Sequence, residues 1–293
     1  SLVSKTCDLL FVPGGLYLGS FRPYITMCQN LLPFAEKEVA RYGLSGRTLR
    51  LKLLARGQAH TFAHSDGIIF LTQYVRDILL TKYSHLQRVR QSIIPHGIDP
   101  VFLCHNDENK KNHDPIRLLY VSRVDLYKHQ WNVVSSVSHL RKEGFNIQLT
   151  LVGSAYPPAL EKLKATIEKV DPNMGFVKYE GLIDHNELAS YYNQADLFVF
   201  ASSCENLPII LLEAMASRLP IACSNRLPMP EVLGDAGIYF EPEDITSINN
   251  ALRKLIFSPK LGKVMAKKAQ ERVNKFTWEQ CAYDTFEFLS AST

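Results

Sequence analysis

The sequence contains no long apolar run, and this absence limits what the protein can be. A helix that crosses a bilayer needs roughly 20 consecutive apolar residues, and no stretch of the 293 residues approaches that length. No secretory signal peptide is recognisable, and the first residue is Ser rather than Met, so the chain need not begin at its native start. We therefore expect a cytoplasmic protein without a membrane-spanning segment.

Paired cysteines and several common catalytic signatures are also missing. The six cysteines are scattered without any C-x-x-C pair, which favours free, mostly buried thiols in a reducing compartment over a disulfide framework. Neither G-x-S-x-G nor G-x-G-x-x-G occurs, which argues against a hydrolase and a dehydrogenase. His105 and His113 have no carboxylate or cysteine at ligand spacing, so no metal site is predicted.

Positive charge is concentrated in the first third of the chain. Residues 1–100 hold 12 Lys and Arg against 6 Asp and Glu, whereas residues 101–293 hold 21 against 23. The excess is densest in residues 41–56, whose leucines and basic residues suit contact with an anionic lipid surface or an acidic acceptor. The alternative is an ordinary surface helix with solvated charges. Nucleic-acid binding is not expected, because there is no strongly basic domain and no recognition motif.

Short apolar runs alternate with helix-like segments along the whole chain. This alternation predicts parallel βαβ units in an α/β fold, with ligands at the carboxyl ends of the strands. The predicted strands are 7–13, 24–28, 67–71, 89–95, 117–122, 147–153, 175–179, 197–201, 220–224 and 237–240. The predicted helices include 46–64, 73–83, 130–142, 158–170, 185–194, 244–257, 259–274, 278–289 and one that begins near Pro208.

The polar, turn-rich stretch 103–115 reads as a linker or an exposed loop between two domains. We therefore predict a first domain at 1–101 and a second at 102–275. The final helix, within 276–293, lies beyond the last β/α repeat.

Two cations follow the first strand of the second domain. Arg123 and Lys128 lie on a strand-end loop that leads into a helix. An arginine fork and a lysine suit a diphosphate. Together with a helix N-terminus they can stabilise a leaving nucleoside diphosphate without a metal. The alternative is two surface cations on a loop. Gly153 ends a later strand, where a missing side chain lets a ligand approach the backbone.

Residues 196–225 form a predicted strand, loop, helix and strand that carry two carboxylates. Backbone N–H groups near the start of the helix can bind sugar hydroxyls or phosphate oxygens. The loop carboxylate, Glu205, can accept two hydroxyls of a hexose, and Glu213, about two helical turns later, can accept a pair from a ribose. Because Glu213 lies inside the apolar run I-I-L-L-E-A-M-A, we expect it to face a specific partner.

As a set, these motifs resemble those of the family 4 retaining glycosyltransferases, over about residues 90–290. The motifs are R-x4-K at Arg123 and Lys128, E-x7-E at Glu205 and Glu213, L-L-E-A-M-A, and P-E-V-L-G-D-A-G-I-Y-F-E-P. The resemblance implies the GT-B architecture of two Rossmann-like, doubly wound domains. It also implies metal-independent transfer of a hexose, with retention, to a glycan or lipid-linked acceptor, as in polysaccharide biosynthesis. The donor would be a UDP- or GDP-sugar.

The resemblance also assigns roles to residues. Those matching Arg123 and Lys128 hold the donor diphosphate, the one matching Glu205 contacts the transferred sugar, and the one matching Glu213 contacts the ribose. The loop around Lys178 and Tyr179 is expected to border the base. The final helix is similar to the segment that crosses back to the N-terminal domain. The remaining donor-side residues are Gly153, Asn206, Leu207, Pro208 and Leu212.

Two features depart from the family pattern. The family's first strand, its glycine-rich loop and two βα units have no counterpart before Cys7. The N-terminal domain is therefore expected to be incomplete, or to be completed by a second polypeptide. Many relatives place a histidine near the sugar where this chain has Gln29 and Asn30, and glutamine carries no proton at neutral pH.

Two hypotheses of different class follow. The chain is either an active retaining hexosyltransferase, or a non-catalytic nucleotide-sugar-binding subunit or inactive remnant.

Overall fold

The computed structural model describes residues 7–103 and 114–291, which form two compact units. Of the described residues, the first unit contains those up to Gly97, the segment Cys204–Leu207 and those from Phe276 onward. The second unit contains the described residues of Ile98–Ser203 and Pro208–Lys275. The sequence instead predicted a first boundary after residue 101 and assigned 204–207 to the second domain.

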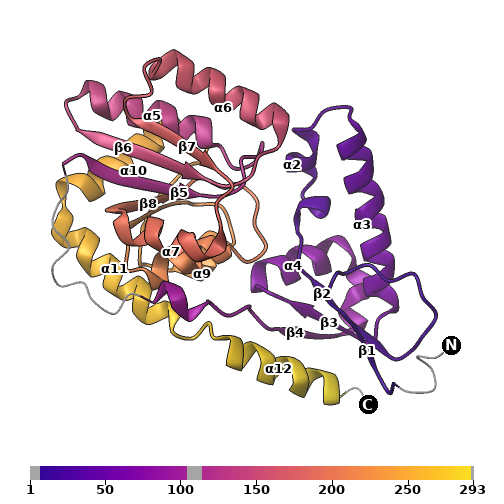
Figure 1. Ribbon diagram of the computed structural model, residues 1–293. Coiled ribbons are helices and arrows are strands. Elements are labelled where there is room, and N and C mark those ends of the chain that lie inside the picture. Colours follow the sequence, from indigo (N-terminus) through magenta and orange to yellow (C-terminus); the bar gives the residue numbers. More distant parts are fainter. Residues whose placement is uncertain (1–6, 104–113, 292–293) are drawn as a thin grey trace. The chain divides into compact units, whose positions relative to one another are not determined.

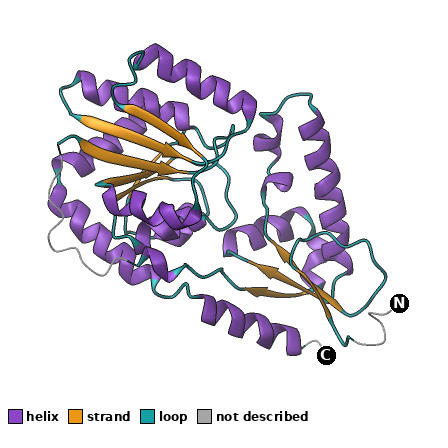
Figure 2. Ribbon diagram, viewed as in Figure 1, coloured by secondary structure: helices purple, strands orange, loops and turns teal. Residues whose placement is uncertain are grey.

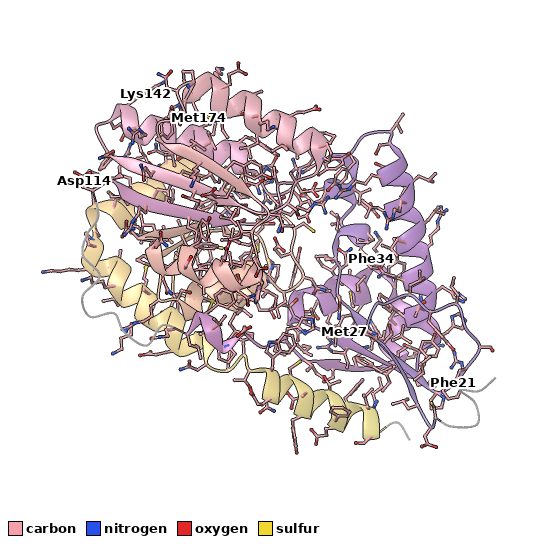
Figure 3. The ribbon with its side chains drawn as sticks, viewed as in Figure 1. Phe21, Met27, Phe34, Asp114, Lys142 and Met174 are labelled. Atoms are coloured by element: carbon pink, nitrogen blue, oxygen red, sulfur yellow. The ribbon has the colours of Figure 1, made fainter. Side chains whose placement is uncertain are left out.

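The first unit is built on a sheet of four parallel strands in the order β1-β2-β3-β4. The strands are β1 (Leu10–Val12), β2 (Tyr24–Cys28), β3 (Gly67–Phe70) and β4 (Arg90–Ile93). Every residue of β2 and β3 is buried, as expected for the inner strands of a parallel sheet. Met27 of β2 and the neighbouring Phe34 belong to this core (Figure 3).

Strand β1 corrects one expectation, because it is half-buried rather than buried. It lies at the edge of the sheet, where one side of a strand has no neighbour among the described residues. The apolar run around it predicted a buried strand because sequence pattern reports hydrophobicity and not position in the sheet.

Helices cover both faces of this sheet. The elements are η1 (Leu32–Phe34), α2 (Glu36–Ala40), α3 (Gly46–His64), α4 (Gln73–Lys82), η2 (Ser84–Arg88) and α12 (Trp278–Ser290). Figure 1 shows α3 and α4 on one face and α12 on the other. The Arg90 guanidinium of β4 lies 4.0 Å from the ring centre of Phe288 in α12. The last helix is thus part of the first unit's fold.

The second unit contains six parallel strands in the order β10-β9-β8-β5-β6-β7. They are β5 (Ile116–Val121), β6 (Ile147–Val152), β7 (Val177–Gly181), β8 (Leu197–Phe200), β9 (Ile221–Ser224) and β10 (Ile238–Phe240). The chain winds outward from β5 in one direction and from β8 in the other. In such sheets ligands bind at the carboxyl ends of the two strands where the order reverses, here β5 and β8.

Helices also cover both faces of the second sheet, as Figures 1 and 2 show. Helices α5, α6 and α10 pack together, and α8 packs against α11. The elements are η3 (Pro100–Phe102), α5 (Gln130–Lys142), α6 (Pro157–Val170), α7 (His185–Gln194), α8 (Ile209–Ala216), α9 (Met229–Leu233), α10 (Ile245–Phe257) and α11 (Pro259–Val273). The prediction of an α/β fold with parallel sheets is confirmed. The five-residue α9 was not predicted, since one short turn leaves no periodic pattern.

The cysteines that the structure describes are not joined in disulfides, which agrees with the prediction of thiols rather than a disulfide framework. Cys28, Cys204, Cys223 and Cys281 are buried and Cys7 is exposed. Cys104, His105 and His113 lie outside the described residues. None of the described helices is both long and apolar enough to cross a membrane.

Gly97 provides a test of how α12 is attached to the first unit. A Cβ atom at this position would lie 2.1 Å from the backbone nitrogen of Trp278, the first residue of α12. Gly97→Ala must therefore displace the helix, and we expect it to destabilise the first unit by about 1–3 kcal/mol. Urea unfolding followed by Trp278 fluorescence, in a Trp131→Phe background, measures the change.

Gly46→Ala is the matched control, because nothing lies within 4 Å of a Cβ atom there. It should leave stability unchanged or raise it slightly, since alanine is the better helix former. Equal stability of the two variants would contradict the close packing of Gly97 on α12.

Candidate functional site

The loops that follow β5 and β8 are tied together by buried hydrogen bonds. The hydroxyl of Tyr120, at 1% exposure, donates to the carbonyl oxygen of Lys128 and accepts from the N–H of Ala201 at 3.3 Å. The N–H of Ser203 donates to the carbonyl oxygen of Tyr127 at 2.8 Å. The two strand ends where ligands are expected are thus held at fixed positions by the second unit's own side chains.

His129 adds a third tie between these loops. Its ring Nε2 lies 2.9 Å from the Ser203 hydroxyl oxygen. Its backbone is left-handed, with φ 51°, and its side chain is buried. A non-glycine residue persists in that conformation only where its surroundings enforce it, and such residues gather at functional sites. No local sequence pattern marks Tyr120, Ser203 or His129, because their partners lie far away in the chain.

The two predicted cations lie on the loop after β5, as expected, but in different environments. Arg123 is half-exposed, and its Nε lies 3.7 Å from a carboxylate oxygen of the fully buried Asp125. Lys128 is only 6% exposed, and its ammonium lies 5.2 Å from the ring centres of both Tyr127 and Phe200. Cation–π attraction of this kind helps to offset the cost of burying an ammonium. Asp125, which sequence reasoning missed, places an anion beside the loop's cations.

Gly153 is required for a reason that the sequence did not reveal. Its φ is +141°, and a Cβ atom there would lie 2.2 Å from the carbonyl oxygen of Ser122. The close neighbour is therefore the backbone that leads to Arg123, rather than a ligand. The missing side chain lets the ends of β5 and β6 approach each other, and so supports the position of Arg123.

Lys178 and Tyr179 lie within strand β7, which begins and ends two residues later than the predicted strand 175–179. The exposed Lys178 ammonium lies 2.5 Å from a carboxylate oxygen of Glu180. The Tyr179 hydroxyl donates to the carbonyl oxygen of Gly153 at 2.9 Å, and burial raises its pKa, so the phenol stays protonated. Tyr179 thus braces the end of β6.

Residues 204–207 belong to the first unit because of the contacts of Asn206. Its side-chain amide donates to the carbonyl oxygen of Cys28 at 2.7 Å, and its own carbonyl accepts from the Thr72 hydroxyl at 3.2 Å. Its Oδ1 is buried without a hydrogen-bond partner among the described residues. Glu205 is half-buried and Leu207 is buried. Within the first unit, the segment Cys204–Leu207 thus contacts the backbone at the end of β2 and the Thr72 side chain after β3.

Gln29 and Asn30 follow β2 directly, next to the Cys28 carbonyl that Asn206 binds. Both are exposed. The Asn30 side-chain oxygen accepts from the N–H of Leu32 at 3.0 Å, so this residue holds the backbone where η1 begins. The Gln29 amide nitrogen lies 3.3 Å from the Met27 sulfur. Of the two predicted residues, Asn30 therefore has a local structural role.

Helix α8 begins one residue later than predicted. Pro208 occupies the N-cap position rather than a place inside the helix, which starts at Ile209. Leu212 is fully buried, and its N–H donates to the Pro208 carbonyl oxygen at 3.3 Å. The side chain of Leu212 therefore packs in the core and acts through the position of α8.

Glu213 is buried, at 5% exposure, and its partner within the protein is Tyr192 of α7. The Tyr192 hydroxyl donates to Glu213 Oε2 at 2.7 Å. Burial raises the pKa of Glu213, against the lowering effects of that hydrogen bond and of nearby His185. Burial, together with the Glu213 carboxylate, also raises the pKa of Tyr192 well above its usual value. The tyrosine therefore stays protonated and orients the carboxylate.

No group of three or more His, Cys, Asp or Glu that could hold a metal ion occurs among the described residues.

A family model described as glycosyl transferases group 1 matches residues 105–272 of the chain. This segment contains Arg123, Lys128, Glu205 and Glu213. It covers more than half of the sequence.

Two curated relatives are similar to parts of the chain. The alpha-monoglucosyldiacylglycerol synthase of Streptococcus pneumoniae is 25% identical over 268 residues, which cover 84% of this chain and 58% of the relative. The O-antigen chain mannosyltransferase B of Escherichia coli is 30% identical over 111 residues, which cover 38% of this chain and 29% of the relative. The chain thus spans less than two thirds of the length of either relative.

Solved structures establish the fold class. Sucrose-phosphate synthase from Thermosynechococcus elongatus aligns with a TM-score of 0.77 at 22% identity, covering 94% of this chain and 70% of that one. Anabaena HepE in complex with UDP-glucose aligns with a TM-score of 0.74 at 14% identity, covering 92% of this chain and 72% of that one. These neighbours are GT-B glycosyltransferases, so the predicted GT-B class is confirmed.

The raised pKa of Glu213 predicts a pH dependence of stability. The folded protein holds this proton more tightly than the unfolded chain does. The associated stability is therefore present below the ordinary glutamate pKa of 4.5 and is lost as the pH rises through the higher pKa of the folded state. Glu213→Gln keeps an acceptor for Tyr192 but removes the titration. The stability of this variant relative to wild type should therefore increase between pH 4.5 and pH 7.5 in urea unfolding.

Glu187→Gln is a suitable control, because Glu187 is an exposed carboxylate in the first turn of α7. Its relative stability should change little over the same range. If the stability of Glu213→Gln relative to wild type stays constant or falls as the pH rises, burial does not raise the pKa of Glu213.

Proposed function

The chain belongs to the glycosyl transferases group 1 family, and we propose that it is a retaining hexosyltransferase. In this proposal it moves a hexose from a nucleotide sugar, a UDP- or GDP-sugar, to a glycan or lipid-linked acceptor in polysaccharide biosynthesis. The observation that carries the proposal is the placement of Arg123 and Lys128 after β5. This is one of the two strands at which the sheet order reverses, where a nucleotide is expected.

The donor diphosphate is held by Arg123 and Lys128. The half-exposed Arg123 fork reaches toward solvent and can bind two phosphate oxygens, while the buried Lys128 supplies a fixed point charge. Because these cations are already positioned, they stabilise the charge that develops on the leaving diphosphate without reorganisation. This arrangement supports transfer without a bound metal.

Retention follows if the acceptor attacks the face from which the diphosphate leaves. The bond between the anomeric carbon and the donor oxygen breaks, and the bond to the acceptor oxygen forms. The acceptor's proton passes to the leaving phosphate oxygen, so no side chain has to accept it. Glu205 and the backbone of Asn206, Leu207 and Pro208 hold the sugar hydroxyls in this proposal.

The ribose is held by Glu213. Its Oε2 is engaged by Tyr192, so Oε1 is the oxygen that meets a ribose hydroxyl. Residues Lys178 and Tyr179 of β7 border the base. Gly153 contributes by letting the backbone before Arg123 lie close to β6.

The acceptor side is proposed to lie at Gln29, the exposed residue after β2. The edge of β1, which has no neighbouring strand on one side among the described residues, supports the proposal that a further segment or a second polypeptide completes this sheet. We also propose a cytoplasmic location with peripheral membrane contact through residues 41–56.

The alternative is a non-catalytic nucleotide-sugar-binding subunit, which the open edge of β1 and the absence of a histidine at Gln29 favour. A donor-hydrolysis assay with UDP-, GDP- and ADP-sugars, alongside a thermal-shift panel, separates the two. Turnover supports the transferase, whereas a ligand-induced rise in thermal stability without turnover supports the binding subunit.

Lys128→Ala tests the diphosphate site. Loss of a charge-assisted hydrogen bond should weaken nucleoside diphosphate binding by about 1.5–3 kcal/mol in calorimetric titration. Lys267→Ala removes an exposed lysine of α11 that pairs with Glu271 at 4.0 Å, and should leave affinity unchanged. Unchanged diphosphate affinity in Lys128→Ala would refute the proposed pocket.

Glu205→Gln tests the division between sugar and nucleotide. The variant should bind the nucleoside diphosphate as tightly as wild type does. Its affinity for the matching nucleotide sugar should fall on the order of tenfold, because a hydrogen bond to a charged group contributes roughly 1.5–3 kcal/mol. Titrations with the diphosphate and with the nucleotide sugar measure both. Equal weakening of the two ligands would show that Glu205 does not face the sugar.

A further inference from the structure

Helix α3 has two apolar faces, and only one of them packs against the protein. Leu51 and Phe62 are buried at 8% and 0% exposure, and the Phe62 ring contacts Phe34 of η1, so this face packs against the first unit. Leu49 and Leu53 are exposed at 60% and 55%. Because they lie four residues apart, they occupy one stripe on the outer surface of the helix. A soluble surface helix would place polar residues there.

This outer stripe is bordered by positive charge. The helix contains four lysines and arginines and no aspartate or glutamate in its 19 residues. At about 100° per residue, Lys52 and Arg56 lie on one side of the leucine stripe and Arg50 lies on the other. All three are exposed. Cations therefore line both sides of the exposed leucines.

Other exposed leucines extend the stripe. Leu44, two residues before the helix, is fully exposed. Leu16, at 42% exposure, lies against α3, since its Cδ1 would be 2.8 Å from a Cβ atom at Gly57. We call the surface formed by Leu16, Leu44, Leu49 and Leu53 the leucine face.

A groove of about 720 Å³ lies beside the leucine face, between α2, α3 and the end of α4. Leu44, Lys52 and Arg56 line it and are also next to the leucine face. Lys82, on the far side of the groove, lies 2.6 Å from a carboxylate oxygen of Glu36. Three cations thus face one carboxylate around a partly apolar groove, which suits a phosphate attached to an apolar group.

We propose that the leucine face and its bordering cations dock the first unit onto a bilayer that contains anionic phospholipids. The leucines enter the boundary between head groups and acyl chains, Arg50 pairs with lipid phosphates, and Lys52 and Arg56 hold a head group at the mouth of the groove. Apolar side chains flanked by cations on both sides are the pattern of helices that lie in the plane of such an interface. This deepens the proposed peripheral contact through residues 41–56 by naming the side chains and the groove that meet the lipids, and it does not depend on sugar transfer.

Charge distinguishes a bilayer from the other occupants of this surface. A second copy of the chain, related by a two-fold axis, would bring the cations of one α3 against those of the other, and like charges at an interface oppose binding. A soluble polyanion would pair with the cations but leave the leucines in water. An anionic bilayer satisfies both kinds of side chain at once.

Vesicle co-sedimentation tests the proposal. The chain should bind vesicles of phosphatidylcholine with 30% phosphatidylglycerol, and bind vesicles of phosphatidylcholine alone at least tenfold more weakly. Because each cation near an anionic surface contributes roughly a fivefold factor, Arg50→Ala, Lys52→Ala and Arg56→Ala combined should weaken binding on the order of 100-fold. Leu49→Ser with Leu53→Ser should weaken it at least tenfold. The vesicle assays contain no nucleotide-sugar donor, so their outcome does not depend on whether the chain transfers a sugar.

Helix α11 offers a matched control. It carries Lys263, Val264 and Lys267, all exposed, on the second unit. Lys263→Ala and Lys267→Ala with Val264→Ser should change vesicle binding less than twofold. A loss equal to that of the α3 variants would show non-specific attraction of a basic protein and would overturn the proposal.

Insertion and competing partners complete the test. In the Leu53→Trp variant, brominated lipids in anionic vesicles should quench the tryptophan fluorescence more than they do in the wild type. No added quenching, or vesicle binding that the leucine changes leave intact, would overturn docking through the leucine face. Binding to soluble polyphosphate without binding to vesicles would also overturn it. Concentration-dependent dimers that the leucine changes abolish, without vesicle binding, would assign the surface to a second copy.

Discussion

The hydroxyl of Tyr120 connects the two strand ends on which the proposed donor site depends. It lies inside the second unit and bonds the backbone at Lys128 and at Ala201. A buried hydroxyl that lost these partners would cost about 1–3 kcal/mol. The two loops therefore keep their relative position, and with them the Lys128 ammonium. A cation that is positioned in advance stabilises charge in a transition state without paying for reorganisation at that moment.

The same unit tolerates buried charge at three places, and each has a compensating neighbour. Lys128 lies over two aromatic rings, Asp125 lies beside Arg123, and Glu213 accepts a hydrogen bond from Tyr192. Uncompensated burial of a charged group is strongly unfavourable, so such groups persist where other contacts or a ligand offset the cost. A buried carboxyl with a raised pKa, such as Glu213 of α8, is typical of functional sites. This fits a site that binds a charged, hydroxyl-rich molecule.

The first unit shows a different constraint, which acts on its surface. Its longest helix, α3, buries one apolar stripe and exposes another, so the helix has no single polar face. Exposed apolar stripes of this kind mark interaction surfaces in otherwise soluble units. The sheet beneath is held from the other face by α12, through contacts such as Arg90 with Phe288. The last helix thus stabilises the unit whose surface α3 presents.

The sequence by itself determined the elements and the chemistry that they carry. Helices α3, α5 and α7 begin and end at the residues that the periodic pattern predicted, because that pattern is local. The tertiary structure decided which distant groups meet. It placed Tyr192 against Glu213, the Ser122 backbone against Gly153, Asn206 against Cys28, and β1 at a sheet edge. None of these follows from local pattern, because each depends on chain segments brought together only when the sheets assemble.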